Sequence, residues 1–438
     1  MVRSAAAARI AEYTNLLREN PDFRWLWLAQ IVSELGDWFY TVALYSLLLD
    51  LTGSAKSIGI AIVLQVLPQV LIAPAAGALN DRLSRKKLMI FADIVRFFVV
   101  LAMLLIQSAD MVWLIYVLLP LETMAWGLFE PGRSAVVPTI LPSRHLVRGN
   151  ALSAATWSFN LAVGATLGGT VAALFGRPAA FVINALTFLL SAWFISRMRL
   201  QEKHILNTPP FHWKELFDFS PTLEGIRYVR GDPRRMAVLF LKGGLGLMGA
   251  HNVILPIYGE RVFPMTAALS DASRAGMLGM SLLMAWRGVG ALLGPLIGAM
   301  WAGDNERRMR HGISVGFCMT AAGYALLSIA PNALLAGLCV VLAHAGGSII
   351  WVFSTTLLML LTQDRLRGRV FSAEFAIHFL AVSGASYVAS TGIDLGLSVR
   401  DAALYVGLSL LLPLGIWLLV LPFWRNTPDR TPVHDNDA

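Results

Sequence analysis

Long apolar stretches alternate with short polar segments along almost the whole chain. Each stretch is long enough for a helix that crosses a bilayer. The stretches are too long for the strands of a membrane barrel, and they lack the alternation of polar and apolar residues that such strands show. The pattern predicts twelve membrane helices, near residues 24–50, 55–80, 87–108, 112–134, 147–175, 178–197, 235–261, 273–302, 311–329, 332–361, 367–394 and 400–424.

Composition narrows the class of protein further. Hydrophobic types make up 56% of the 438 residues, and charged types make up 14%, whereas soluble domains carry about 25% charged residues. This composition excludes a soluble enzyme, a disordered chain and a collagen-like fibre. The two cysteines, Cys318 and Cys339, fall inside apolar stretches and form no zinc or disulfide pattern. We therefore predict an all-α polytopic membrane protein.

The positive side chains indicate how the helices are oriented. The chain has 35 Lys and Arg against 27 Asp and Glu, which gives a net charge of +8. If both termini lie in the cytoplasm, most of the basic residues fall in cytoplasmic segments, as membrane proteins prefer. We therefore predict a multi-pass protein with both termini in the cytoplasm, and we assign its positive charge to topology and not to nucleic acid.

Five parts follow from this topology. We expect a cytoplasmic segment at 1–23, a six-helix bundle at 24–197, a cytoplasmic linker at 198–234, a second six-helix bundle at 235–424 and a cytoplasmic tail at 425–438. The linker contains the run PPFHWKELFDFSPTLEGIRYV, in which bulky apolar residues alternate with charged ones. This run predicts a short amphipathic helix on the cytoplasmic membrane face. A solvated linker is the alternative.

The two predicted bundles repeat each other in sequence. RGNALSA begins at Arg148, at the start of the fifth span, and RGRVFSA begins 219 residues later at Arg367, at the start of the eleventh. Pro74 precedes Gly-Ala by three residues in the second span, and Pro295 does the same in the eighth. Two repeats of equal topology imply a pseudo-two-fold axis along the membrane normal, with a site between the halves that suits alternating access.

Two short motifs carry a resemblance to a known family. The loop after the second span reads GALNDRLSRKK from Gly77, and it resembles the G-x-L-x-D-R-x-G-R-[KR] signature of the major facilitator superfamily, with Ser84 in place of glycine. The fifth span contains GATLGG from Gly164. This run is similar to the G-P-x-x-G-G signature of antiporters in that superfamily, with Ala165 in place of proline.

Further segments resemble one branch of the superfamily, which includes enterobactin exporters, macrolide efflux proteins and bacterial lysophospholipid transporters. They are LGD at Leu35, DIVR at Asp93, PGRSA at Pro131 and LEGIRY at Leu223. The resemblance spans essentially the whole chain. It implies the major facilitator fold, with twelve helices in two pseudo-symmetric six-helix bundles, and a transporter in the plasma membrane, the inner membrane of a bacterium.

The loop after the second span is expected to act as a conformational gate. Gly77 lets two helices approach closely. Asp81 is expected at the N-terminus of the eleventh helix, near Gly368, where the helix dipole favours an anion. Arg85 is expected to pair with a carboxylate of the fourth span. The gate residues that we predict are Gly77, Asp81, Arg82, Arg85, Glu130, Asp93 and Arg96, with Glu130 as the partner of Arg85 and Asp93–Arg96 as a structural pair near the loop. The alternative is that these charges only set the topology.

Carboxylates at membrane depth are costly, and they are candidates for function. Glu34 and Asp37 lie three residues apart about halfway along the first span, and Glu122 lies at mid-depth on the fourth. We predict that Asp37, Glu34 and Glu122 couple protons to transport. The alternative is a buried structural ion pair.

A second group of residues is predicted to contact substrate. Arg287 lies at mid-depth on the eighth span, as a counter-ion for those carboxylates or as an anchor for an anionic substrate. Glu374 and His378 lie one helical turn apart and form a proton relay, a metal-type pair or a satisfied polar pair. The predicted substrate-binding residues are Arg287, Trp126, Asn160, His251, Glu374 and His378. Ordinary core packing is the alternative for the histidine His251 and the aromatic Trp126.

Together these features predict a secondary transporter that works by alternating access, most simply as a proton-coupled exporter of an amphipathic drug, siderophore or metabolite. The alternative is a lysophospholipid flippase that moves its lipid inward without proton coupling. No nucleotide-binding or hydrolytic motif supports an integral-membrane enzyme. We expect no enzymatic activity, cofactor or bound metal. The expected partners are a small-molecule or lipid substrate, protons and the bilayer, with a monomeric chain and no nucleic acid.

Overall fold

The computed structural model describes residues 12–202, 205, 213–266, 269, 271–303, 305–363 and 366–424. Over these ranges the chain is helical and contains no strand. The first half consists of α2 (Pro21–Thr52), α3 (Ala55–Arg82), α4 (Arg85–Ala102) with η1 (Met103–Leu105), η2 (Ala109–Met111), α5 (Val112–Ile140), α6 (Ser143–Phe175) and α7 (Arg177–Ser196). The linker contributes η4 (Trp213–Phe217) and α8 (Ser220–Arg230). The second half consists of α9 (Pro233–Gly246), η5 (Leu247–Ala250), α10 (His251–Ile257), η6 (Tyr258–Val262), α11 (Ala272–Ala302), α12 (Glu306–Ser328), α13 (Ala333–Leu361), α14 (Arg367–Asp394), α15 (Val399–Ser409), α16 (Leu411–Val420) and η8 (Leu421–Trp424).

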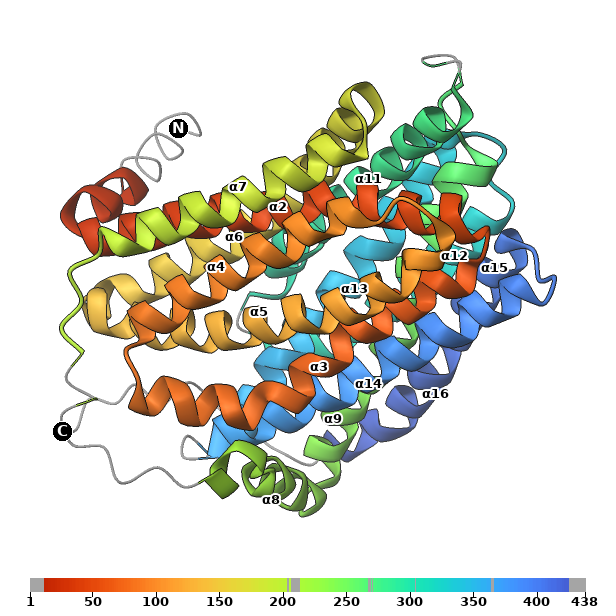
Figure 1. The fold of residues 1–438 in the computed structure, drawn as a ribbon. Coiled ribbons are helices and arrows are strands. Elements are labelled where there is room, and N and C mark those ends of the chain that lie inside the picture. The colour runs from red at the N-terminus through yellow and green to blue at the C-terminus, as the bar shows by residue number, and fades with distance from the viewer. Residues whose placement is uncertain are drawn as a thin grey trace.

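The predicted membrane helices are present, and they run side by side along one direction (Figure 1). Within the described residues, ten helical segments are long and apolar enough to cross a membrane. The other two predicted spans are α2 and α12, which have lower hydropathy because α2 carries Glu34 and Asp37 and α12 begins with a charged run. The outward faces of the peripheral helices α7 and α16 are apolar, with Leu186 and Leu412 exposed. Such faces suit a lipid environment.

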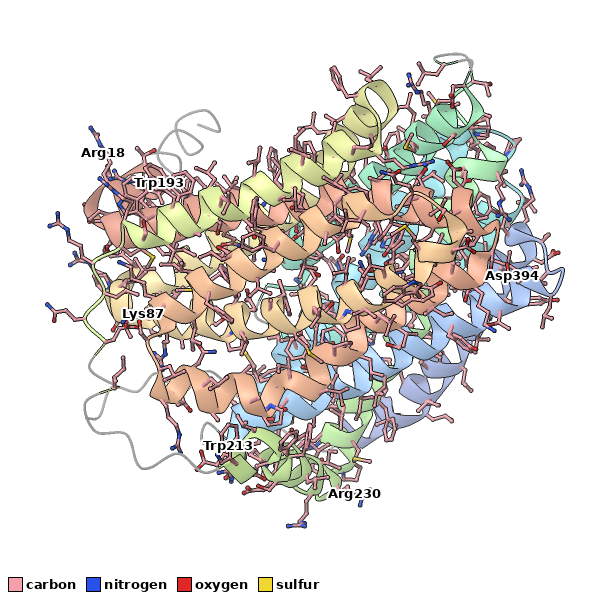
Figure 2. The ribbon with its side chains drawn as sticks, in the orientation of Figure 1. Arg18, Lys87, Trp193, Trp213, Arg230 and Asp394 are labelled. Atoms are coloured by element: carbon pink, nitrogen blue, oxygen red, sulfur yellow. The ribbon has the colours of Figure 1, made fainter. Side chains whose placement is uncertain are left out.

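Arg18 and Lys87 mark one end of the bundle, and Asp394 marks the other (Figure 2). We call the first the basic end, because the end of α3, the start of α4 and the residue after α7 carry positive charge there: Arg82, Arg85, Lys86, Lys87 and Arg197. The other end we call the opposite end. At the basic end the Lys86 ammonium donates hydrogen bonds to the carbonyl oxygens of Ser196 and Met198, each at 2.7 Å. These two hydrogen bonds join the third and sixth spans of the first half at the basic end.

Proline and glycine explain where the spans depart from a continuous α-helix. Span seven is one run of α9, η5, α10 and η6, in which the glycine-rich stretch around Gly246 and Gly249 changes to a 3₁₀ turn. Span twelve is interrupted at Leu410, three residues before Pro413. Proline has no N–H to donate, and its ring clashes with the preceding turn. The predicted boundaries of both spans are otherwise matched by the structure.

The linker forms a helix in part of the predicted segment. α8 covers residues 220–230 and packs closely on α14 at Gly225. A Cβ at this position would lie 2.1 Å from the carbonyl oxygen of Arg369, so the close contact requires glycine. Arg227 and Arg230 are exposed on the other side of α8. Residues 209–212 of the predicted amphipathic run lie outside the described residues. The placement of α8 on a membrane surface stays a prediction.

Glycines on α6 allow close contact with α2. A Cβ on Gly168 would lie 2.3 Å from the Cα of Phe39 on α2, and a Cβ on Gly164 would lie 2.8 Å from the Cβ of Trp38. Gly169 faces α11 of the second half, where a Cβ would overlap the hydroxyl of Ser281. The glycine-rich run of the fifth span thus packs α6 against both halves at once.

We predict that Gly168→Ala destabilises the protein, because the added methyl group would overlap the backbone of α2. Overpacking of this kind costs about 1–3 kcal/mol, which should lower the thermal midpoint of the detergent-purified protein by several degrees. Gly415→Ala on α16 is the matched control, since a Cβ there meets nothing within 4 Å. Equal midpoints for the two variants would contradict the predicted contact.

Candidate functional site

A cavity of about 220 Å³ lies between the two halves of the bundle. The first half lines it from α2, α3, α4 and α5, and the second half from α10 and α11. Its wall combines carboxylates, guanidinium groups, amides and aromatic rings. The lining residues are Asp37, Trp38, Tyr40, Thr41, Tyr45, Ile62, Gln65, Val66, Gln69, Arg96, Glu122, Thr123, Trp126, Asn252, Met284 and Arg287. Of the predicted site residues, the cavity brings together Asp37, Glu122, Trp126 and Arg287 with Arg96.

Arg96 holds the polar wall of this cavity together. Its Nη2 lies 2.8 Å from both carboxylate oxygens of Asp37, and its Nε lies 3.0 Å from Oε1 of Glu122. The Asp93 carboxylate is 3.7 Å away on the same helix. The guanidinium group is only 1% exposed and lies 4.0 Å from the ring centroid of Phe188. One cation therefore joins α2, α4 and α5.

Arg96 and not Arg287 is the counter-ion of two predicted proton carriers, Asp37 and Glu122. Asp93 and Arg96 form the predicted pair, with 3.7 Å between Oδ1 and Nη1. The pair does not lie at the loop of the basic end, because the long Arg96 side chain extends from α4 into the centre of the first half. Asp93 is fully buried beside it, and neither of its oxygens has a hydrogen-bond partner among the described residues.

Glu34 belongs to a different polar group from Asp37. Its carboxylate accepts hydrogen bonds from Gln30 at 2.9 Å and from Asn160 of α6 at 3.2 Å. It does not line the cavity. The carboxylate that shares a cation with Asp37 is therefore Glu122 and not Glu34. Asn160 contacts Glu34 and lies outside the lining, whereas the prediction placed it with substrate.

Arg287 lines the cavity from the second half. Its Nη1 donates to Oδ1 of Asn252 at 3.3 Å, and its guanidinium carbon lies 5.5 Å from the ring centroid of Trp38. The predicted ligand His251 lies outside the lining, where its ring packs edge-on against His344 with the centroids 4.8 Å apart. His344 in turn contacts the hydroxyl of Tyr324 at 3.0 Å.

A second buried ion pair occupies the other half. Lys242 lies 3.6 Å from Oε1 of Glu374 and donates to the hydroxyl of Thr355 at 2.8 Å. Its ammonium nitrogen lies 3.3 Å from the ring centroid of Trp351. His378 contacts the backbone carbonyl of Lys242 at 3.0 Å. Glu374 is thus paired with a lysine, a partner that we did not predict although Lys242 is the only lysine in its span.

Metal-ligating residues do not gather into a centre in the part of the chain that the structure describes. No group of three or more His, Cys, Asp or Glu side chains is placed to hold a metal ion there. Glu374 and His378 therefore lack a third ligand of this kind within the described residues.

The gate contacts predicted at the basic end are absent from this conformation. Asp81 is 78% exposed and lies 3.7 Å from Arg85. A Cβ on Gly77 or on Gly368 would meet nothing within 4 Å, so neither glycine forms the close helix contact that we predicted. The carboxylate of Glu130 is paired with Arg133, which lies one turn away on α5, at 2.5 Å.

The other basic residues of this loop bind within the first half or to the linker. Arg85 donates to the backbone carbonyls of Asn80 and Ala135 at 3.1 and 3.2 Å, instead of to Glu130. Arg82 binds Glu215 of η4 at 2.5 Å. The basic side chains of this loop are therefore held by other partners, which is the physical reason that the predicted gate contacts are missing.

The two halves are joined instead at the opposite end. Asp394, at the end of α14, accepts hydrogen bonds from the hydroxyl of Ser54 and from the backbone amides of Ala55 and Lys56, at 2.7 and 3.1 Å for the two amides. These amides begin α3. A carboxylate at a helix N-terminus is favoured both by the free amides and by the helix dipole.

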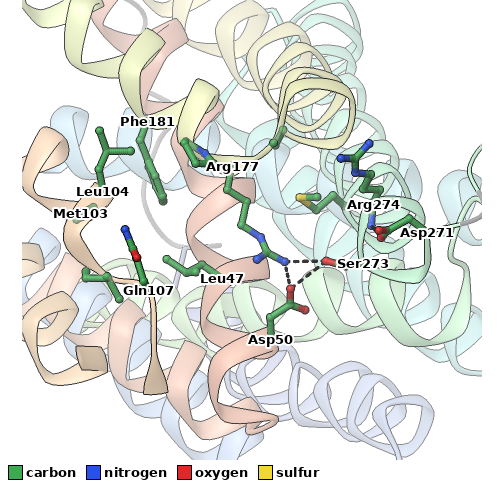
Figure 3. Close-up of a pocket in the computed structure, with 15 residues that line it drawn as sticks. Leu47, Asp50, Met103, Leu104, Gln107, Arg177, Phe181, Asp271, Ser273 and Arg274 are labelled. Carbon is green, nitrogen blue, oxygen red and sulfur yellow. Dashed lines mark hydrogen bonds and ion pairs between the residues drawn. The ribbon is translucent and has the colours of Figure 1, made fainter. Parts of the chain in front are cut away.

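A second contact between the halves lies at the same end, beside a cavity of about 530 Å³ (Figure 3). The Arg177 guanidinium group is paired with Asp50, and it donates to the hydroxyl of Ser273 at 2.7 Å. The Asp50 carboxylate also accepts from that hydroxyl at 3.0 Å. Sequence reasoning missed these residues and Asp394, because their importance depends on which end of the bundle is closed.

Comparison with known proteins identifies relatives of the whole chain. A sequence model described as Major Facilitator Superfamily matches residues 26–386. The "Putative bacilysin exporter BacE" of Bacillus subtilis is 24% identical over 91% of this chain and 93% of its own length. The "Multidrug efflux pump Tap" of Mycolicibacterium fortuitum is 25% identical over 91% of this chain and 95% of its own length. The chain spans about half the length of another relative, the "Uncharacterized MFS-type transporter YfiS" of Bacillus subtilis, at 28% identity.

Solved structures share the fold. The nucleoside transporter NupG superposes with a TM-score of 0.69 and 10% identity over 91% of this chain and 99% of that chain. At this identity the likeness concerns the arrangement of helices alone.

We predict that Arg96→Gln strongly destabilises the protein, because it leaves the carboxylates of Asp37, Glu122 and Asp93 buried without their cation. Removing one partner of a buried ion pair costs about 3–5 kcal/mol. Thermal unfolding of the purified protein measures the loss, and adding Asp37→Asn and Glu122→Gln should recover part of it. Arg287→Gln is the matched control, since that guanidinium has no carboxylate contact among the described residues. An equal loss in both variants would refute the central role of Arg96.

Proposed function

The chain belongs to the Major Facilitator Superfamily, and from this premise we propose that it exports an amphipathic small molecule in exchange for protons by alternating access. That it is a membrane transporter with efflux-type relatives follows from the comparisons. Direction, coupling ion and substrate class form the proposal. It includes a monomeric chain in the plasma membrane, with both termini in the cytoplasm.

The observation that carries the proposal is the Arg96 cluster in the wall of the cavity between the halves. Three carboxylates surround one guanidinium group, so the cluster holds more acidic groups than cations. A proton can therefore enter it without a new counter-ion. Asp37 is the best site for the exchange, because 26% of its side chain is exposed, compared with 9% for Glu122 and none for Asp93.

Protonation of Asp37 changes what the cation contacts. A neutral carboxyl group no longer forms an ion pair with Arg96, whereas Glu122 and Asp93 remain as its partners. The change is local to the cavity and reaches α2, α4 and α5 directly. This gives the proton a way to act on the packing of the first half around the substrate.

The pattern of contacts between the halves supports alternating access. The halves touch along two antiparallel helix pairs, α3 with α14 and α6 with α11. In both pairs a glycine allows close approach, since a Cβ on Gly59 would overlap Ser390 and one on Gly288 would lie 2.5 Å from the Cα of Ala162. The halves are joined at the opposite end by Asp394 and Arg177, whereas the predicted gate contacts at the basic end are not formed. Transport requires the reverse arrangement as well, in which the gate residues Gly77, Asp81 and Arg85 form their contacts.

The proposal is tested first through Asp37. A thermal-shift screen of the purified protein against antibiotics, siderophores and lysolipids supplies a ligand, which is then followed in proteoliposomes with an imposed pH gradient. We expect Asp37→Asn to abolish accumulation against a concentration gradient, because the amide cannot carry the proton, while exchange of ligand for ligand remains at saturating ligand concentration. Asp110→Asn, exposed at the opposite end, is the matched control.

Two outcomes would contradict this assignment. Unchanged uphill transport by Asp37→Asn would remove Asp37 as the proton carrier. Translocation of a fluorescent lysophospholipid that is insensitive to proton uncouplers would support the lipid flippase instead.

The second test concerns the closed end. Asp394→Asn removes the charge that binds the start of α3, and we expect it to raise the population that is open at the opposite end. Spin labels at Ser108→Cys and Leu334→Cys, in a variant with Cys318 and Cys339 replaced by serine, would report this as a longer distance. Asp401→Asn is the matched control, because the Asp401 carboxylate accepts a hydrogen bond from Ser398 in its own half. Identical distance distributions for the two variants would rule out the role of Asp394.

A further inference from the structure

Arg287 differs from the other basic residues at membrane depth. Arg96 is paired with Asp37, Arg133 with Glu130 and Lys242 with Glu374. In the described part of the chain, Arg287 makes no ion pair and contacts only the neutral Asn252 and the ring of Trp38. A charge at membrane depth without a counter-ion is costly and marks a functional site. The free-energy cost of burying this guanidinium group falls when an anion binds to it. A carboxylate is a suitable anion, because its two oxygens match the paired N–H donors of a guanidinium group.

The anion must come from outside the chain, because the cavity carboxylates are already held by Arg96. Asp37 receives both of its hydrogen bonds from one nitrogen of Arg96, and Glu122 accepts from another. Asn252 lies beside Arg287 and can hold a carboxylate oxygen with its amide nitrogen. The free positive charge of the cavity thus lies on its second-half wall.

The opposite wall offers negative charge to the same ligand. Asp37 lines the same cavity and keeps 26% of its side chain exposed. A cavity of about 220 Å³ lies below the range of roughly 300–1,000 Å³ that holds drug-sized ligands, so one small molecule can contact both walls. The rings of Trp38, Trp126, Tyr40 and Tyr45 complete the lining and suit an apolar or aromatic body.

We propose that the transported molecule is a small zwitterion of amino-acid or dipeptide type, with its carboxylate on Arg287 and Asn252 and its ammonium group on Asp37. This inference rests on the proposed function. It also gives that function a coupling rule: the ammonium group and the proton compete for one carboxylate, so that loading either one expels the other. Arg287 meanwhile holds the carboxylate end and fixes the direction in which the ligand lies.

Matched peptides test this assignment. Alanyl-phenylalanine carries both charges, its C-terminal amide lacks the anion, and its N-acetyl derivative lacks the cation. We would measure the binding of each by calorimetry to the full-length protein in nanodiscs. We expect the free dipeptide to bind at least tenfold more tightly than either derivative, because each derivative leaves one charged wall without its partner.

Variants of Arg287 separate recognition of the carboxylate from general binding. In Arg287→Gln the dipeptide and its amide should bind equally weakly, whereas Arg287→Lys should keep part of the preference. The ligand-free thermal midpoint of Arg287→Gln should not fall, since no ion pair is lost. Equal binding of dipeptide and amide to the wild type, or full binding of the dipeptide to Arg287→Gln, would overturn the proposal. Failure of all three peptides to bind would also overturn it.

Different results would contradict the zwitterion assignment and proton-coupled export. If tetraphenylphosphonium, a cation without a carboxylate, is accumulated under a pH gradient while no peptide binds, the zwitterion assignment is wrong and proton-coupled transport stands. If ligands of every charge class show no movement that depends on the gradient, proton-coupled export itself is wrong.

Discussion

The structure of the first half depends on one guanidinium group. Arg96 is almost completely buried, and its carboxylate partners come from three helices, α2, α4 and α5. A cation in such a place is tolerated only if its partners are held within hydrogen-bonding distance. The same requirement that fixes the packing of these helices also places Asp37 in the wall of the central cavity. The stability of the first half and the proton exchange that we propose would therefore depend on the same atoms.

The fold could be predicted from the sequence because its determinants are local. Apolar stretches of membrane length, basic loops and the repeat of RGNALSA by RGRVFSA are all visible without coordinates. The family model over residues 26–386 and the helices of the structure confirm the superfamily and its all-helical architecture. The hydropathy of α2 and α12 is lowered by the polar residues that function and packing require, yet the pattern still revealed both helices.

The site could be predicted only in part, because sequence gives the depth of a residue and not the rotation of its helix. Depth identified Asp37, Glu122 and Arg287, which line one cavity. It could not show that Arg96 extends inward to the carboxylates, or that Lys242 is the partner of Glu374. The contacts at the two ends of the bundle depend in addition on the conformation that the protein adopts. The sequence is the same in every conformation, so it does not indicate which end is closed.

The Arg96 cluster also bears on how the chain enters the membrane during its synthesis. α2 and α4 leave the ribosome before α5, so Arg96 reaches the bilayer with Asp37 and Asp93 as partners but before Glu122 has emerged. An arginine that entered the lipid on a lone helix would carry its charge into hydrocarbon. We therefore expect the first spans of the nascent chain to assemble inside the insertion machinery and to enter the lipid as a group.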